Sequence, residues 1–212
     1  MKSRRFQELA TKSEVVIVDS GGANLASLSF AFERLGARAH VTADGAIIAS
    51  AQRVVIPGVG AASDAMQRLQ AAGLTHVLPA LTQPVLGVCL GMQVLFRGSE
   101  EGPTACLDVL PDTVRRLQAA PGHPVPHMGW NQLELRRFDP LLEDVEFNAY
   151  VYFVHSYAAP VSELTLASTN YGGRLSAVVR RGNFWGVQFH PERSGRTGGR
   201  LLQNFLELDA CC

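Results

Sequence analysis

Three short apolar runs, each followed by a turn and a helical pattern, limit most strongly what this chain of 212 residues can fold into. The runs are residues 14–19, 53–56 and 84–88, and the helical patterns after them cover residues 25–35, 65–72 and 90–96. Continuous apolar runs of this length are typical of strands buried on both faces of a parallel sheet. The succession of strand, turn and helix predicts an α/β fold with an open mixed, largely parallel sheet flanked by helices.

The chain after residue 110 has a different pattern, in which short apolar runs follow one another closely. We expect a closing helix over residues 197–208 and strands at residues 113–118, 132–136, 150–157, 164–169, 175–180 and 184–189. Strands spaced so closely favour antiparallel hairpins, and so predict additional antiparallel strands and a second small sheet in the C-terminal half. Residues 14–210 contain no linker and are expected to form one domain, preceded by a disordered extension at residues 1–13.

The composition excludes several classes of protein. Hydrophobic residues make up 47% of the chain and charged residues 18%, which excludes a disordered protein. The 19 basic and 19 acidic residues balance, so no nucleic-acid partner is expected. No run of 18 apolar residues is present and the N-terminus lacks the apolar core of a secretion signal, which predicts a cytoplasmic protein without a membrane partner. The four cysteines contain no Cys-x-x-Cys pair, so neither a metal nor a cofactor is expected.

A cysteine follows the third apolar run, in the sequence Gly87-Val-Cys89-Leu-Gly91. The spacing is that of the Gly-x-Ser-x-Gly nucleophile elbow, in which small flanking residues permit a strained turn that exposes the central side chain. Open α/β sheets bind their ligands at the carboxyl ends of strands, so a thiol at this place is a candidate nucleophile. A small buried core residue is the alternative interpretation of Cys89.

A histidine and a glutamate two residues apart end another apolar run, Gly186-Val-Gln-Phe-His190-Pro-Glu192. If the chain stays extended here, both side chains point to the same side. The carboxylate can then orient the imidazole, whose other nitrogen faces a thiol, as in a triad of nucleophile, base and orienting acid. An ordinary strand-end histidine is the alternative for His190 alone, but it accounts poorly for Cys89, His190 and Glu192 together.

These motifs resemble those of a known family. Residues 87–93, Gly-Val-Cys-Leu-Gly-Met-Gln, and residues 189–192, Phe-His-Pro-Glu, resemble the two hallmark motifs of class I (triad) glutamine amidotransferases. Further segments, at residues 57–60, 99–101, 126–131 and 152–157, are similar to those of the glutaminase subunits of imidazole glycerol phosphate synthase. The segment His-Met-Gly-Trp-Asn at residues 127–131 separates these subunits from other class I members, and the likeness extends over roughly residues 15–208.

The resemblance implies the class I glutamine amidotransferase fold and the hydrolysis of glutamine to glutamate and ammonia. Cys89 would attack the side-chain amide of glutamine, His190 would pass a proton to the departing nitrogen, and Glu192 would hold the histidine. Main-chain N–H groups would stabilise the oxyanion, and the expected donors are Leu90 together with Val59 or Gly60. Contacts to the substrate amino acid are expected from Gln93, Glu101, Ser156 and Tyr157.

The family also implies a partner that uses the ammonia. This partner is a TIM-barrel cyclase, which combines ammonia with the phosphoribulosyl-formimino intermediate PRFAR and yields imidazole glycerol phosphate and AICAR in histidine biosynthesis. A heterodimer with this cyclase is therefore expected. The residues that match interface positions of the family are Met128, Trp130, Asn131, Tyr152 and Arg193.

Two other interpretations and one departure from the family pattern qualify this assignment. A class I amidotransferase that serves another synthase, such as pyridoxal 5′-phosphate synthase, is disfavoured by residues 126–131. A catalytically silent regulatory module is disfavoured because Cys89, His190 and Glu192 are all present. The departure lies at Ser20-Gly-Gly-Ala-Asn24, which lacks the tyrosine and the second glycine usual in the first turn.

Overall fold

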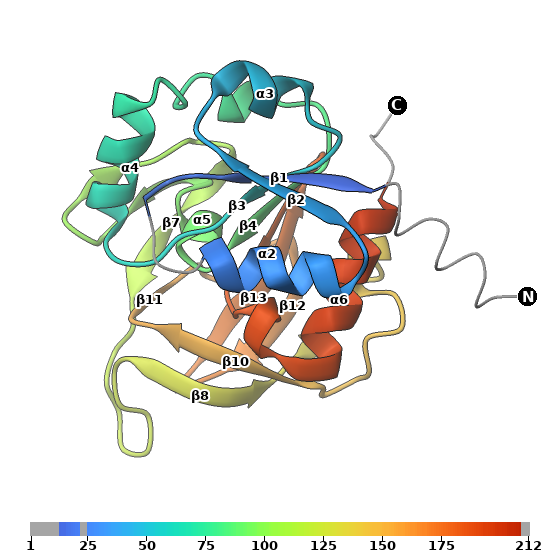
Figure 1. Ribbon diagram of the computed structural model, residues 1–212. Helices are drawn as coiled ribbons and strands as arrows, with labels where there is room; N and C mark the ends of the chain where they lie inside the picture. The colour runs from blue at the N-terminus through green and yellow to red at the C-terminus, as the bar shows by residue number, and fades with distance from the viewer. Residues whose placement is uncertain (1–12, 22–24, 209–212) are drawn as a thin grey trace, which may run out of the picture.

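The computed structural model describes residues 13–21 and 25–208, and its largest element is an eight-stranded mixed sheet (Figure 1). In spatial order, the strands are β2 (Arg38–Thr42), β1 (Glu14–Val18), β3 (Val54–Ile56), β4 (Val85–Val88), β14 (Phe184–Val187), β13 (Arg174–Arg181), β12 (Thr165–Asn170) and β9 (Glu134–Leu135). The strands from β2 to β14 run parallel to one another, whereas β13, β12 and β9 are antiparallel to their neighbours. The predicted α/β fold with a mixed, largely parallel sheet is confirmed.

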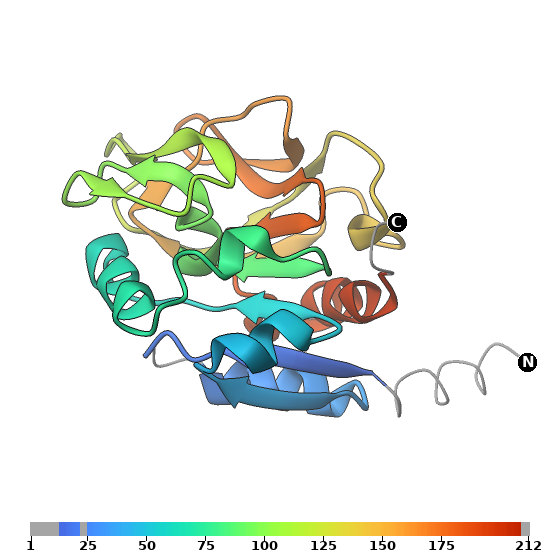
Figure 2. The same cartoon turned by 90° about the horizontal axis from the view of Figure 1, so that it is seen from above.

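Helices cover both faces of this sheet, because alternate residues of its strands are apolar on either side. Val15 and Ile17 of β1 belong to the core layer under α2 (Leu25–Arg34) and α6 (Gly195–Glu207). Val16 and Val18 belong to the opposite layer, which also contains residues of α3 (Gly45–Ser50), α4 (Ala62–Ala71) and α5 (Leu90–Gln93). Figure 1 shows α2 and α6 side by side on one face of the sheet, and Figure 2, seen from above, shows α3 in front of the strands.

Two smaller sheets complete the fold. One contains four strands in the order β11 (Tyr157–Ala158), β7 (Leu110–Arg116), β5 (Phe96–Ser99) and β6 (Thr104–Ala105). The other is an antiparallel pair formed by β8 (His127–Gln132) and β10 (Tyr150–His155), which lies at the lower edge of the molecule in Figure 1. Short 3₁₀ turns occur at η1 (Leu78–Ala80), η2 (Pro140–Leu142) and η3 (Pro191–Arg193).

Several predicted elements are wrong in extent. β2 and α3 were not predicted. The edge strand β2, Arg-Ala-His-Val-Thr, is half exposed and lacks the continuous apolar run of a buried strand. The helix predicted over residues 90–96 ends at Gln93, and the chain then enters β5. The strand predicted at 132–136 is replaced by the end of β8 and the two-residue β9. The strand predicted at 184–189 ends at Val187 and pairs parallel with β4 rather than only in a hairpin.

Some of the predictions concern residues that the structure does not describe. Residues 1–12 of the predicted extension at 1–13, residues 22–24 of the first turn that departs from the family pattern, and Cys211 and Cys212 lie outside the described residues. None of the helices within the described ranges reaches the length and apolar character that crossing a membrane requires.

Candidate active site

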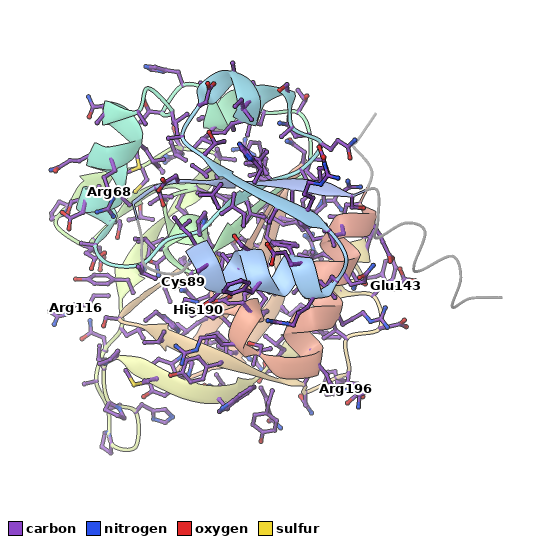
Figure 3. All side chains as sticks on the ribbon, in the orientation of Figure 1. Arg68, Cys89, Arg116, Glu143, His190 and Arg196 are labelled. Carbon is purple, nitrogen blue, oxygen red and sulfur yellow. The ribbon has the colours of Figure 1, made fainter. Side chains whose placement is uncertain are left out.

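Three neighbouring parallel strands end at the same place and bring the predicted catalytic residues together. The turn Pro57–Gly60 follows β3, Cys89 follows β4, and His190 lies shortly after β14. The main-chain N–H of Cys89 donates to the carbonyl of Val187, 2.8 Å away, so the β4–β14 ladder continues up to the cysteine. A cavity of about 410 Å³ opens here, with Cys89 and His190 in its lining. These two residues are labelled next to each other in Figure 3.

Cys89 adopts the strained conformation of a nucleophile elbow. Its φ is 54° and its ψ is −110°, a region that a residue with a side chain rarely occupies. The flanking glycines make this turn possible, because a Cβ on Gly91 would overlap the carbonyl oxygen of Ile56 and one on Gly87 would lie 2.7 Å from the carbonyl oxygen of Gly91. The turn therefore packs directly on β3, which supports the elbow inferred from the Gly-x-Cys-x-Gly spacing.

His190 is held by Glu192 across a tight turn rather than along an extended strand. The His190 Nδ1 and Glu192 Oε1 atoms are 2.8 Å apart, and both side chains are buried. The expectation that the chain stays extended from His190 to Glu192 is wrong, because residues Pro191–Arg193 form the 3₁₀ turn η3. The contact still forms because Ser194, which follows this turn, donates its hydroxyl to the His190 carbonyl over 2.7 Å and fixes the turn.

The surroundings of His190 favour its protonated form. Burial lowers the pKa of this imidazole. Hydrogen bonds to Cys89 and Glu192 and the negative charges of these two groups outweigh burial and raise the pKa to about 10. The imidazolium therefore lies between a sulfur on one side and a buried carboxylate on the other. An imidazolium in this place can donate a proton to a leaving group next to the sulfur.

The turn after β3 lies against the start of α5, directly after Cys89. A Cβ on Gly58 would be 2.9 Å from the main-chain nitrogen of Gly91, so the turn contacts the start of α5. Val59, Gly60 and Leu90, the predicted oxyanion donors, line the same cavity as Cys89. Gly60 has a φ of 92°, which glycine adopts with little strain.

The four residues predicted to contact the substrate, Gln93, Glu101, Ser156 and Tyr157, also line this cavity. The amide nitrogen of Gln93 donates to the Tyr157 carbonyl over 2.8 Å and to Gln188 Oε1 over 2.9 Å, so Gln93 Oε1 is the group that it can offer to a ligand. One carboxylate oxygen of Glu101 accepts the N–H of Ala62, at the start of α4, over 2.8 Å. The other oxygen can accept a bond from a ligand amine.

The structure adds residues that the sequence analysis did not select. Gln188 is 1% exposed and its amide nitrogen lies 3.9 Å from Cys89 Sγ. His155 lines the cavity together with Pro126 and Val154. A polar residue in the apolar run before His190 was the available signal for Gln188, and a histidine in the strand 150–157 was the signal for His155.

The predicted interface residues lie mostly on one exposed face of β8 and β10. Met128 and Trp130 are 62% and 56% exposed, and the ring of Trp130 contacts that of Tyr152 edge-on at 6.0 Å. The Arg193 guanidinium lies 4.8 Å from the centre of the Tyr152 ring. Asn131 differs from the others, because its side chain hydrogen-bonds to His127 and to the Asn170 carbonyl on the inner side of β8.

Two relatives of similar sequence carry the same name. Residues 16–208 match the family Glutamine amidotransferase class-I. The chain is 53% identical, over 196 residues, to imidazole glycerol phosphate synthase subunit HisH of Xanthomonas euvesicatoria. This alignment covers 92% of this chain and 98% of the relative. It is 50% identical, over 198 residues, to the subunit of the same name from Xylella fastidiosa, with 93% and 99% covered.

Solved structures share the fold at lower sequence identity. A glutamine amidotransferase that is 21% identical aligns with a TM-score of 0.70, covering 91% of this chain and 97% of that one. Another glutamine amidotransferase, from Thermotoga maritima, is 16% identical and aligns with a TM-score of 0.62, covering 92% and 83%. From its sequence and its fold, this chain belongs to the class I glutamine amidotransferases and, within them, to the imidazole glycerol phosphate synthase subunit HisH family.

Proposed function

We propose that Cys89, His190 and Glu192 form the catalytic triad with which this glutamine amidotransferase hydrolyses glutamine and supplies ammonia for imidazole glycerol phosphate synthesis. The observation that carries the proposal is the meeting of Cys89 and His190 in one cavity whose lining also includes Gln93 and Glu101. The buried contact of Glu192 with His190 completes the set of nucleophile, proton donor and orienting acid.

The first half of the reaction transfers the acyl group to sulfur. Cys89 Sγ attacks the side-chain carbonyl carbon of glutamine, and the carbonyl electron pair moves onto oxygen. Collapse of this tetrahedral intermediate breaks the C–N bond, while His190 donates its proton to the departing nitrogen. The products of this step are ammonia and a thioester on Cys89, and the charge of Glu192 keeps the imidazole oriented throughout.

The second half releases glutamate. A water molecule gives its proton to the now neutral His190 and adds to the thioester carbonyl, and Cys89 leaves as the sulfur anion. Both tetrahedral intermediates place negative charge on the same oxygen, so both need N–H donors close to Cys89. Leu90, directly after the nucleophile, supplies one donor, and the Val59–Gly60 segment supplies the second.

The cavity recognises glutamine by its α-amino and α-carboxylate groups. Gln93 Oε1 and the second oxygen of Glu101 are acceptors that suit an ammonium group. The carbonyls of Ser156 and Tyr157 already accept bonds from Leu117 N–H and Gln93, so this segment contacts the substrate through its other polar atoms. Together these groups hold the amino-acid end while the amide lies against Cys89.

The ammonia is used by a cyclase subunit with a TIM-barrel fold, which docks on the exposed face of β8 and β10. Met128, Trp130 and Tyr152 form an apolar stripe there, and aromatic anchors of this kind contribute strongly to protein interfaces. Arg193, stacked on Tyr152, places a positive charge at the edge of the stripe. The cytoplasm keeps thiols reduced, which supports it as the place of a reaction that uses the free thiol of Cys89.

One assay separates this proposal from a silent regulatory module and from a subunit of another synthase. The purified chain is mixed with glutamine and the cyclase subunit, with and without PRFAR, and glutamate, imidazole glycerol phosphate and AICAR are measured. The proposal requires all three products in the complete mixture. Glutamate without the nucleotide products would assign the chain to another synthase, and the absence of glutamate in every mixture would indicate a silent module.

A further inference from the structure

A buried pair of histidines connects the inner side of β8 to the glutamine cavity. His127 of β8 and His155 of β10 face each other across the antiparallel pair, with His127 Nδ1 2.9 Å from His155 Nε2. They are 2% and 6% exposed. The ring of His127 is stacked between those of Phe153 and Tyr171, at 4.7 and 3.9 Å between centroids. The two buried rings hydrogen-bond to each other, because a buried donor or acceptor without a hydrogen-bond partner raises the free energy of the folded state.

The partners of this pair determine which nitrogen of each ring carries hydrogen. His155 Nδ1 lies 2.8 Å from the Tyr157 carbonyl, which can only accept, so His155 must donate from Nδ1. Burial lowers the pKa of His155 to about 3 and that of His127 to about 4, so both rings are neutral near pH 7. His155 Nε2 is therefore an acceptor, and the hydrogen between the rings belongs to His127 Nδ1. His127 Nε2 then accepts from the Asn131 amide nitrogen at 3.3 Å.

The orientation of Asn131 is fixed independently. Its amide nitrogen also donates to the Asn170 carbonyl over 3.0 Å, and its amide oxygen accepts the N–H of Gln132 over 2.8 Å. Every bond from Asn131 through His127 and His155 to the Tyr157 carbonyl thus runs in one direction. No other tautomer of either ring satisfies all these partners at once.

The network continues from the Tyr157 carbonyl to Cys89, with the direction of donation reversed at this shared acceptor. The Tyr157 carbonyl accepts from His155 and from the Gln93 amide, so both of its lone pairs are used. The second hydrogen of the Gln93 amide goes to Gln188 Oε1 over 2.9 Å. Gln188 must consequently present its amide nitrogen to Cys89 Sγ, at 3.9 Å. This arrangement leaves Gln93 Oε1 for the substrate.

We propose that His127, His155 and Gln188 are positioning residues of the glutaminase site, which fix Gln93 for binding glutamine and the amide of Gln188 against the Cys89 sulfur. This inference rests on the proposed function of Gln93 and Cys89. Asn131 begins the network on β8, and the neighbouring residues Met128 and Trp130 project from the other face of that strand. A shift of β8 relative to β10 changes the His127–His155 contact, and the network transmits that change to Gln93.

The tautomers can be tested without measuring activity. Nitrogen-15 NMR of the full chain labelled in histidine should show hydrogen on Nδ1 and a bare Nε2 for both His127 and His155 between pH 6 and 8. Their signals are assigned from His127→Gln and His155→Asn variants. Hydrogen on Nε2 of either ring, or a charged ring in this pH range, would overturn the network.

A matched pair of substitutions at His155 tests its positioning role. His155→Leu removes the bond to Tyr157, and we expect the KM for glutamine to rise about 10- to 100-fold, with a smaller change in kcat. His155→Asn keeps an amide N–H near the position of Nδ1 and should restore the KM to within about threefold of the unmodified chain. The exposed His76 is outside the network, so His76→Leu should leave the KM unchanged. Equal KM values for His155→Leu and the unmodified chain would refute the role.

Two thiol reagents distinguish a failure of this inference from a failure of the proposed function. A glutamine analogue with a diazoketone in place of the amide requires Gln93 to bind, whereas iodoacetamide reacts with Cys89 without it. His155→Leu should slow labelling by the analogue about tenfold or more and leave alkylation by iodoacetamide within twofold. Equal slowing of both reagents indicates a general structural defect and contradicts the positioning role. Cys89 that reacts with iodoacetamide in a chain that never hydrolyses glutamine would instead refute the proposed function.

The Gln188 contact has its own pair of variants. Gln188→Glu keeps an acceptor for Gln93 but replaces the N–H that faces Cys89 with negative charge, so it should slow alkylation by iodoacetamide about tenfold while changing the KM less than His155→Leu does. Gln188→Leu removes both contacts and should affect both measurements. An unchanged alkylation rate in Gln188→Glu would remove Gln188 from the network. Melting temperatures of all variants show whether they are folded.

Discussion

The main-chain N–H of His190 donates to the carbonyl of Tyr152 over 3.0 Å, and this bond ties the candidate catalytic histidine to strand β10. The N–H of Tyr152 in turn meets the hydroxyl of Ser194 at 3.0 Å, and that hydroxyl donates to the His190 carbonyl. The side chain of Tyr152 lies on the exposed face of β10, under the guanidinium of Arg193. A partner seated on this face therefore contacts a strand that is bonded directly to the catalytic loop.

This connection leads us to expect glutaminase activity to be low in the isolated subunit and to rise when the cyclase binds its substrate. The Pro57–Gly60 turn can rest with a carbonyl facing the thiol, and partner contacts at Trp130 would favour the arrangement with an N–H in place. Since one oxyanion donor contributes about 10²–10³ in kcat, the rise should approach that size. Glutamine hydrolysis is compared in the free subunit, the complex, and the complex with PRFAR. Equal rates in the three states would exclude the switch.

Cys89→Ala should abolish glutamine-dependent synthesis and leave ammonia-dependent synthesis in the complex nearly intact. The reason is that, in the proposed reaction, Cys89 acts only in making ammonia, whereas the nucleotide chemistry is assigned to the cyclase. Imidazole glycerol phosphate formation is measured with glutamine and, separately, with an ammonium salt. A parallel loss of both activities would show that Cys89 has a structural role in the complex.

Glu192→Gln should reduce kcat less than Cys89→Ala does, by a factor of about 10 to 100, because an orienting residue contributes less than the nucleophile. It should also lower the pKa of His190, since the carboxylate is one of the groups that raise this pKa from 6.5 to about 10. The charged imidazole stabilises the fold fully below pH 6.5, and this contribution is lost as the pH rises through about 10. NMR titration of His190 and urea unfolding at several pH values measure both effects. An unaltered titration in the variant would contradict the role given to Glu192.

Trp130→Ala should weaken binding of the cyclase subunit about 30-fold, the effect of removing an aromatic anchor of about 2 kcal/mol. The side chain is 56% exposed in the free subunit, so its melting temperature should hardly change. Phe138→Ala is the matched control, because Phe138 is 85% exposed but lies outside β8 and β10. Titration calorimetry measures the affinity of both variants for the cyclase subunit. Similar losses for the two would show that the interface is not the β8–β10 face.

Gly91→Ala should destabilise the fold by about 3 kcal/mol and impair catalysis, because the added methyl overlaps the Ile56 carbonyl and pushes the elbow away from β3. Gly199→Ala on α6 is the control, since nothing beyond its chain neighbours and its own helix backbone lies within 4 Å of the added Cβ. In a helix this change should stabilise by about 0.5–1 kcal/mol. Urea unfolding measures both free energies. An unchanged free energy of unfolding and unchanged activity in Gly91→Ala would show that the elbow can accommodate the added methyl group.

The family, the mixed α/β fold and the amidotransferase activity could be predicted from the sequence, and the comparisons confirm them. These predictions depended on local patterns, such as the apolar run before Cys89 and the glycines on either side of it. Glycine spacing is a local steric requirement, so it can be read along the chain. The roles of Cys89, His190 and Glu192 stay predictions, although the structure places Cys89 and His190 in one cavity and Glu192 in contact with His190.

Tertiary structure alone decided the relations between distant segments. The parallel pairing of β14 with β4 puts His190 beside Cys89, and no local pattern specifies that pairing. The turn that joins His190 to Glu192 is 3₁₀ rather than extended, because Ser194 and Tyr152 hold its ends. The inward orientation of the Asn131 side chain and the hydrogen bond between His127 and His155 likewise depend on the register between β8 and β10. The sequence by itself determined the buried strands, the helices that follow them and the chemistry of the site residues, whereas burial and strand pairing determined which polar atoms meet.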